Sequence, residues 1–188
     1  MPVLRGALAA AVAACVGGSA LLGPAAGLTH VVLLVGSGWA YNLLLKRTVL
    51  SWLPYVVAFG SLPAVVWLAL DPPVLPPAWM VAVGGLLGLG AHLVNVIPDL
   101  ADDAATGVRG LPHRLGARPT AVLAVLVLTA GSAVAVLGPD GPVPGWAWAL
   151  LVGVTVLAMA ALLRGGRAPF RTALVVAVVD VVMLLVRA

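Results

Sequence analysis

Long apolar runs constrain this sequence more than any other feature. About seven runs follow one another along the chain, at residues 7–22, 28–45, 53–70, 79–97, 120–137, 146–163 and 172–186. The segments between them are rich in glycine and proline, as turns are. A helix that crosses a membrane needs about 20 mainly apolar residues, and these runs are too long for the strands of a membrane barrel. The pattern predicts an all-α, polytopic transmembrane helix bundle with about seven spans.

Composition agrees with this prediction. Hydrophobic residues make up 63% of the chain and charged residues 9%, and the mean hydropathy is +1.18. So few polar groups cannot cover a surface that faces water, which excludes an ordinary soluble domain. We expect residues 1–188 to form a single transmembrane domain in the lipid bilayer. The net charge of +4 does not indicate nucleic acid, because topology explains the basic residues better.

The charged residues predict an orientation. With the N-terminus in the cytoplasm, nine basic residues lie on the cytoplasmic side: Arg5, Lys46, Arg47, Arg109, Arg114, Arg118, Arg164, Arg167 and Arg171. Asp71, Asp140 and Arg187 fall on the outer side. This is the positive-inside pattern. It favours a multi-pass protein of the cell membrane, and it favours a first span over the alternative of a signal peptide with a lipidation box "VAAC".

Three of the six aspartates lie within five positions, in "NVIPDLADDAATGVRGLPHRLG". On a continuing helix, Asn95, Asp99 and Asp103 would form one stripe, while Asp102 would face elsewhere. Pro98 is expected to kink that helix. Two carboxylates one turn apart at a hydrated helix end suit Mg²⁺, which takes one or two protein carboxylates and completes its shell with water and phosphate oxygens. The alternative is an ordinary acidic loop in contact with water.

A second set of polar residues lies at the end of the second predicted span. Asn42 and the only lysine, Lys46, are four residues apart in "WAYNLLLKRT" and share a helix face. An amide near the membrane usually needs a partner. Lys46 and Arg47 could equally be anchors whose charged ends reach the interface.

These two stretches together resemble the UbiA family of intramembrane prenyltransferases. "YNLLLKRTVLSWLPY" looks like the Tyr/Lys motif of that family, although Tyr41 and Lys46 are five residues apart here instead of the usual four. The later stretch looks like the second aspartate-rich motif of the family, through Asp99, Asp103, Gly107, Arg109, Leu111, Pro112, Leu115 and Gly116.

The resemblance implies a reaction and a site. Such enzymes ionise an allylic prenyl diphosphate with Mg²⁺ and transfer the prenyl group to an aromatic or other lipophilic acceptor. By this analogy Asp99 and Asp103 would hold the metal, with Asn95 nearby, and the apolar tail would lie between helices. Lys46, Arg109 and Arg114 would neutralise the diphosphate, and Tyr41 and Asn42 would contact the substrate.

The chain departs from the family in one respect. The family fold has nine transmembrane helices, and its first motif, NDxxDxxxD, follows the second helix. This chain has about seven spans, corresponding to roughly the third to ninth helices, and no acidic residue precedes Tyr41. Half of the expected metal site is therefore missing, and loss of one preorganised charge-stabilising group already costs about 2.7–4 kcal/mol. We expect no normal turnover unless a longer chain or a second chain supplies that motif.

Two other functions stay open. A non-catalytic membrane protein could use the same site to bind a prenyl lipid or a partner subunit, and a small-solute transporter is a weaker alternative. Asp180 supports the transporter, because it lies near the middle of the last span, where an ionisable group is by default a functional hypothesis. Asp180 could equally be hydrogen-bonded between helices. His92 is either a neighbour of the site or a packed helix histidine.

Overall fold

The structure is a computed structural model that describes residues 2–105 and 107–187. All regular elements in these ranges are helices, and their order is α1 (Pro2–Ala20), α2 (Pro24–Thr29), η1 (His30–Val35), α3 (Gly36–Ala40), η2 (Tyr41–Leu45), α4 (Leu53–Leu68), α5 (Ala78–Val96), α6 (Leu100–Ala105), α7 (Leu111–Leu115), α8 (Ala117–Leu137), α9 (Gly145–Arg164) and α10 (Ala168–Arg187). The elements η1 and η2 are π-helices within the continuous helical segment from α2 to η2. The predicted all-α class is confirmed.

The apolar helices match the predicted spans. Six helical segments of the described chain are long and apolar enough to cross a membrane: Val3–Ala20, Pro24–Leu45, Ala78–Val96, Ala117–Leu137, Gly145–Arg164 and Ala168–Arg187. The predicted span at residues 53–70 corresponds to α4, an apolar helix of 16 residues. At about 1.5 Å per residue, α4 is somewhat shorter than the roughly 30 Å hydrocarbon layer. The chain is thus a polytopic helix bundle.

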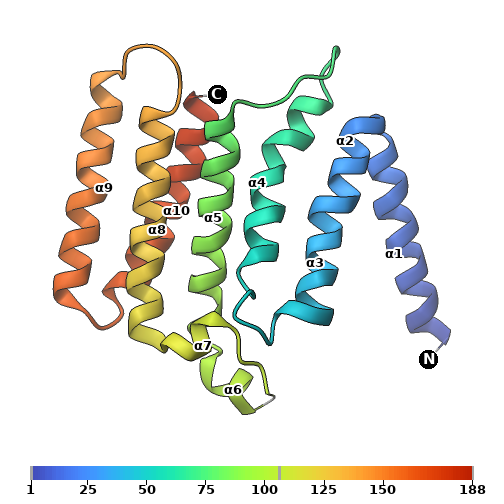
Figure 1. Cartoon of the computed structure of the whole chain (residues 1–188), viewed down its shortest axis with the longest axis horizontal. Helices are drawn as coiled ribbons and strands as arrows, with labels where there is room; N and C mark the ends of the chain where they lie inside the picture. Colours follow the sequence, from blue (N-terminus) through green and yellow to red (C-terminus); the bar gives the residue numbers. More distant parts are fainter. Residues whose placement is uncertain (1, 106, 188) are drawn as a thin grey trace.

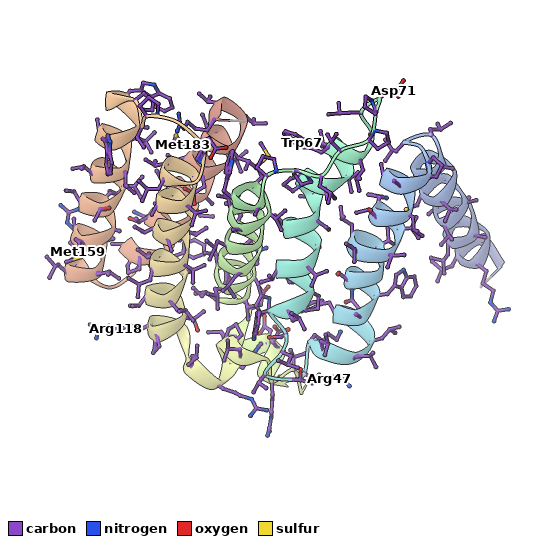
Figure 2. The ribbon with its side chains drawn as sticks, turned by 45° about the horizontal axis from the view of Figure 1, so that its top comes forward. Arg47, Trp67, Asp71, Arg118, Met159 and Met183 are labelled. Atoms are coloured by element: carbon purple, nitrogen blue, oxygen red, sulfur yellow. The ribbon has the colours of Figure 1, made fainter. Side chains whose placement is uncertain are left out.

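The helices run alternately up and down, and the two termini lie at opposite ends of the bundle (Figure 1). The short helices α6 and α7 and the connection from η2 to α4 lie at the same end as the N-terminus (Figure 1). We call this the motif end. Arg47 and Arg118 lie at this end and Asp71 at the opposite one (Figure 2). The charge asymmetry that the sequence predicts is therefore present in the fold.

The core lies among α5, α8, α9 and α10. Val83, Leu93, Val125 and Val176 are among its fully buried side chains. At the edge of the bundle lie α1 and the segment from α2 to η2 (Figure 1). In the most apolar stretch of each, only 6% of the residues are buried. At the far end of α10, the guanidinium of Arg187 donates to the carbonyl of Val136 in α8, 3.4 Å away. The basic residue on the predicted outer side thus contacts the end of a neighbouring helix.

Two glycines let α4 and α5 approach closely. Gly84 and Gly88 are one turn apart on α5 and face the backbone of α4. A Cβ atom at Gly88 would lie 2.3 Å from the carbonyl oxygen of Tyr55, and one at Gly84 would lie 2.5 Å from that of Phe59. No side chain fits at such distances. Small residues four apart are a common means of packing helices in membranes, where close van der Waals contact replaces the hydrophobic effect.

Asp180 is fully buried between α10 and α8. Its Oδ1 accepts a hydrogen bond from the hydroxyl of Ser132, which is also fully buried. Its Oδ2 lies against Gly131, where a Cβ atom would be only 2.9 Å away. This contact is the hydrogen-bonded alternative that the sequence left open, and it joins two helices of the core.

We expect Ser132→Ala to destabilise the bundle by about 0.6–1.7 kcal/mol, the range for hydrogen bonds between membrane helices. Asp180→Asn keeps an oxygen acceptor and should be milder. Thermal unfolding of the detergent-solubilised protein measures both changes. Thr129→Ala is the matched control, since the Thr129 hydroxyl donates only within α8, to the carbonyl of Val125. Equal stability of the Ser132 and Thr129 variants would contradict a role for the Ser132–Asp180 bond.

Candidate functional site

The Tyr/Lys stretch is wound as a π-helix. The backbone N–H of Lys46 donates to the carbonyl of Tyr41, 2.9 Å away, which closes a turn between residues five apart. On an α-helix, residues five apart point about 140° away from each other. The i to i+5 hydrogen bond of a π turn instead brings them to nearly the same side. The unusual spacing of Tyr41 and Lys46 is therefore absorbed by the local winding of the helix.

The aspartate-rich stretch begins where α5 ends. Residues 97–99 form a turn, and α6 begins at Leu100. The predicted stripe from Asn95 to Asp103 requires a continuing helix, and the turn around Pro98 interrupts that helix. The N–H of Asp103 donates to the carbonyl of Asp99 at 2.8 Å, which places these residues one turn apart. Asp99 is exposed and Asp103 is partly exposed.

A histidine contacts one of the two carboxylates. His113 Nε2 lies 3.2 Å from Asp103 Oδ2 and joins α7 to α6. The side chain of His113 is 7% exposed and that of Asp103 is 34% exposed, so solvent reaches the carboxylate from the other side. The backbone N–H of Val108 also donates to the carbonyl of Asp103, at 3.0 Å. Asp103 is thus oriented by the loop that follows it.

The two stretches meet at Gly110, although about sixty residues separate them along the chain. A Cβ atom at Gly110 would lie 2.6 Å from the hydroxyl oxygen of Ser51 and 3.1 Å from the carbonyl oxygen of Lys46. The Ser51 hydroxyl accepts a hydrogen bond from the N–H of Leu111, at 3.1 Å. The connection from η2 to α4 therefore lies directly against the loop between α6 and α7.

Aromatic rings pack beneath this junction. The ring of Tyr55 on α4 meets the ring of Tyr41 edge to face, with centroids 5.3 Å apart, and stacks on Phe59 at 6.5 Å. His92 on α5 lies 4.8 Å from Tyr55 and 6.0 Å from Tyr41, centroid to centroid. The cluster thus connects η2, α4 and α5.

Two adjoining cavities share Phe59. One has a volume of about 280 Å³, and Tyr41, Asn42 and Tyr55 also line it. The other has a volume of about 660 Å³, is lined by apolar side chains of α4, α5 and α10, and continues along α4 past Leu62 and Val66. The smaller cavity contains the polar side chains of Ser37, Tyr41, Asn42 and Tyr55 among apolar ones, whereas the larger cavity is almost wholly apolar.

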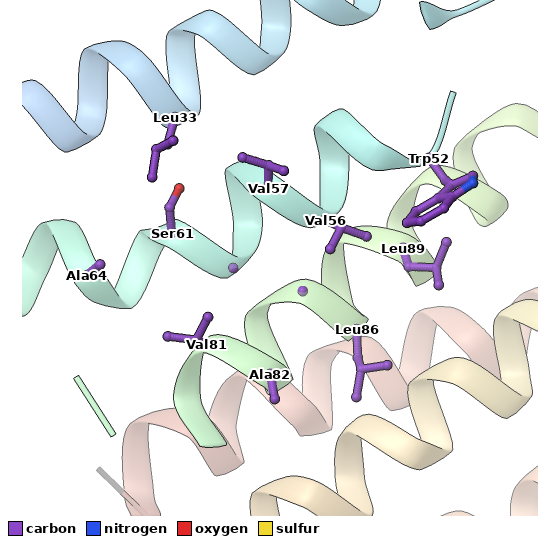
Figure 3. A pocket seen from close by; sticks show the side chains of 12 residues that line it. Leu33, Trp52, Val56, Val57, Ser61, Ala64, Val81, Ala82, Leu86 and Leu89 are labelled. Atoms are coloured by element: carbon purple, nitrogen blue, oxygen red, sulfur yellow. The ribbon is translucent and has the colours of Figure 1, made fainter. Parts of the chain in front are cut away.

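A third cavity, of about 690 Å³, lies on another face of α4 and α5, with Leu33 of η1 above it (Figure 3). Val57 and Ser61 project toward it from α4, and Leu86 and Leu89 belong to its α5 side (Figure 3). The hydroxyl of Ser61 donates to the carbonyl of Ala58, at 2.9 Å, within its own helix. This cavity is an apolar groove that contains none of the predicted site residues.

The other predicted residues lie at the surface of the motif end. Asn42, Asn95, Arg109 and Arg114 are exposed, and Lys46 is partly exposed. The Asn42 amide donates to the carbonyl of Gly38, at 2.9 Å, and Arg114 Nε donates to that of Arg109, at 3.3 Å. The structure thus brings Tyr41 and Asn42 together at the smaller cavity, and it brings Gly110, next to Arg109, against the backbone of Lys46. Asn95 lies across the helix break.

Sequence reasoning did not identify Ser51, Tyr55 and His113 as neighbours of the site. Tyr55 had a usable signal, because it is one of only two tyrosines in the chain and follows the Tyr/Lys stretch closely. Ser51 had no such signal, because its partners His92 and Leu111 are distant in the sequence. His113 had none either, because it lies ten residues from Asp103, which is not a spacing that a single helix predicts. His92, for which both interpretations were open, lies beside the site and is also 1% exposed.

The donor set suits Mg²⁺ in part. Asp99 and Asp103 offer two carboxylates one turn apart that water can reach, which is sufficient for an ion that keeps several waters. Among the described residues, no group of three or more histidine, cysteine or acidic side chains could hold a metal ion. A metal here would therefore depend on oxygens of a bound substrate.

Comparison with known proteins gives one match. The model of the UbiA prenyltransferase family matches residues 3–178, which is most of the chain. No curated protein and no solved structure matches.

Proposed function

The chain belongs to the UbiA prenyltransferase family, and on this basis we propose that it binds a prenyl diphosphate at its motif end and transfers the prenyl group to a lipophilic acceptor. The observation that carries the proposal is a pair of cavities that are both lined by Phe59. A prenyl diphosphate has a charged head and a long apolar tail. The smaller cavity carries polar side chains near the motif end, and the larger cavity is apolar.

The head group would be held by side chains of both motif stretches. Lys46 and Arg109 would neutralise the diphosphate oxygens, with Arg114 beside them, since guanidinium and ammonium groups are the usual partners of phosphate. Tyr41 and Asn42 would contact the substrate where it enters the smaller cavity. The tail would extend along α4 past Phe59.

In the proposed reaction, the bond between the allylic carbon and the diphosphate oxygen breaks, and pyrophosphate leaves with the electron pair. Lys46 and Arg109 stabilise the charge that develops on the leaving group. Tyr55 and Phe59 line the smaller cavity, and their aromatic faces would stabilise the allylic cation there. The acceptor then forms a bond to that carbon and loses a proton. Mg²⁺ held by Asp99 and Asp103 would add Lewis-acid stabilisation of the leaving group.

A second candidate function is binding of the prenyl diphosphate without chemistry. The observation that favours it is the small donor set, because the described residues contain no group of three or more histidine, cysteine or acidic side chains that could hold a metal. A diphosphate carries several negative charges, so one carboxylate-held ion leaves much of that charge unbalanced. Further carboxylates from a second polypeptide chain would restore turnover.

The orientation follows from the charges. Because Lys46, Arg47, Arg109, Arg114 and Arg118 lie in the segments of the motif end, the positive-inside rule supports a cytoplasmic location for that end in a cell membrane. A charged, water-soluble head group would then reach the site from the cytoplasm.

The protein in lipid vesicles, supplied with labelled farnesyl or geranylgeranyl diphosphate, tests the proposal. We expect labelled substrate to bind in the presence of Mg²⁺ and to be released when EDTA is added. Release of pyrophosphate in the same sample would establish transfer or hydrolysis, whereas binding without release would support the second candidate function. If the protein-containing vesicles retained no more labelled prenyl diphosphate than empty vesicles do, with or without Mg²⁺, both candidate functions would be contradicted.

A further inference from the structure

We propose that Ser51 and His92 are positioning residues that clasp the two motif stretches together and thereby set the separation of the cationic groups on either side of the site. The assignment of the cations rests on the proposed function, whereas the clasp itself rests on contacts among Ser51, His92, Gly110 and Leu111.

The Ser51 hydroxyl makes two hydrogen bonds. It accepts one from the N–H of Leu111, at 3.1 Å, and shares another with His92 Nε2, at 3.0 Å. Ser51 precedes α4, His92 belongs to α5, and Leu111 begins α7. A single hydroxyl therefore joins three elements that are distant in the sequence.

Burial makes these bonds hard to replace. Ser51 and His92 are each 1% exposed, so water cannot easily take over the role of either partner. Loss of one partner would leave a buried donor or acceptor unsatisfied, which is more costly than the loss of an exposed hydrogen bond. Gly110 completes the clasp, because any side chain at this position would collide with the Ser51 hydroxyl and approach the Lys46 carbonyl.

The clasp has a consequence for charge. Gly110 lies against the carbonyl of Lys46. Because Arg109 precedes Gly110, this contact brings the backbones of the two cationic residues close together. If the junction opens, the two cations move apart, and a diphosphate can no longer contact both at once. Weaker substrate binding should follow, with less effect on the bond-breaking step.

Trypsin cleavage after Arg109 reports on the clasp without reference to activity. The purified protein in detergent is digested, and fragments that begin at Gly110 are followed by mass spectrometry, with cleavage after Arg167 as the internal reference. Proteolysis of a native loop requires local opening. We expect Ser51→Ala and His92→Leu each to raise the cleavage rate after Arg109 about tenfold, and the double variant to add little to either.

Two controls separate the clasp from general loosening. His92→Gln keeps a polar group near the position of Nε2 and should stay within about twofold of the wild type. Ser61→Ala removes a buried hydroxyl of α4 that bonds only within its own helix, and it should also leave the rate unchanged. Wild-type cleavage rates in Ser51→Ala and His92→Leu would overturn the clasp.

A second readout keeps the clasp distinct from the proposed function. If the protein turns over a prenyl diphosphate, Ser51→Ala should raise KM about tenfold and change kcat much less. If the wild type shows neither binding nor turnover, the proposed function fails, yet faster cleavage in Ser51→Ala would still support the clasp. An unchanged KM together with an unchanged cleavage rate would exclude it.

Discussion

The Asp99→Asn/Asp103→Asn double variant is expected to lose Mg²⁺-dependent binding of a prenyl diphosphate, by about 100-fold or more. Asparagine has nearly the same size as aspartate but no charge, so the change removes both anionic ligands with little effect on packing. For comparison, removal of one preorganised charge-stabilising group typically lowers kcat by a factor of about 10²–10³, and the double variant removes two charged groups. Binding of labelled farnesyl diphosphate to the protein in vesicles, with and without Mg²⁺, measures the effect.

Asp102→Asn is the matched control. Asp102 is an exposed aspartate of the same short helix, and it lies one residue, or about 100° of helix rotation, from Asp103. It should bind the diphosphate as the wild type does. If the double variant retains Mg²⁺-dependent binding, or if Asp102→Asn weakens binding equally, the carboxylate pair does not hold the metal. In the second case, the effect belongs to the net charge of the loop.

Gly88→Val is expected to destabilise the bundle by about 1–3 kcal/mol, as overpacking of a close-packed interior does, and to displace Tyr55 from His92. A Cβ atom at this position would lie 2.3 Å from the Tyr55 carbonyl oxygen and 2.8 Å from the Cβ atom of Phe59. The backbones of α4 and α5 would have to separate. Thermal unfolding in detergent measures the loss, and substrate binding measures the displacement, since the cavities on both sides of Phe59 would change shape.

Gly153→Val tests whether this effect is local. Gly153 lies in the middle of α9, and a Cβ atom there has no neighbour within 4 Å. Both substitutions place a β-branched residue in a helix of the bundle, so any general effect of valine on helix formation is common to both. Should the two variants unfold at the same temperature, the close approach of α4 to α5 would not be a source of stability.

The Tyr/Lys stretch shows why spacing alone was insufficient. A spacing of five positions places the side chains of Tyr41 and Lys46 far apart on an α-helix, and the sequence offers no sign that the helix winds as a π-helix at this point. The hydrogen bond from the N–H of Lys46 to the carbonyl of Tyr41 shows that the helix winds as a π-helix here. By contrast, the expected effect of Pro98 was correct in kind, because a proline lacks an amide donor and α5 ends at Val96.

The sequence by itself determined that this chain is a polytopic helix bundle with all but one of its basic residues on one side, because apolar runs and charge depend only on residue type. It also determined the one-turn spacing of Asp99 and Asp103, since hydrogen bonds within a helix are local. Only the tertiary structure decided that Ser51, His92 and Leu111 meet, that His113 contacts Asp103, and that Asp180 bonds to Ser132. Such contacts depend on how closely the elements pack. Gly84 and Gly88 allow α4 and α5 to approach closely, and Gly110 allows its loop to approach Ser51, because glycine has no side chain.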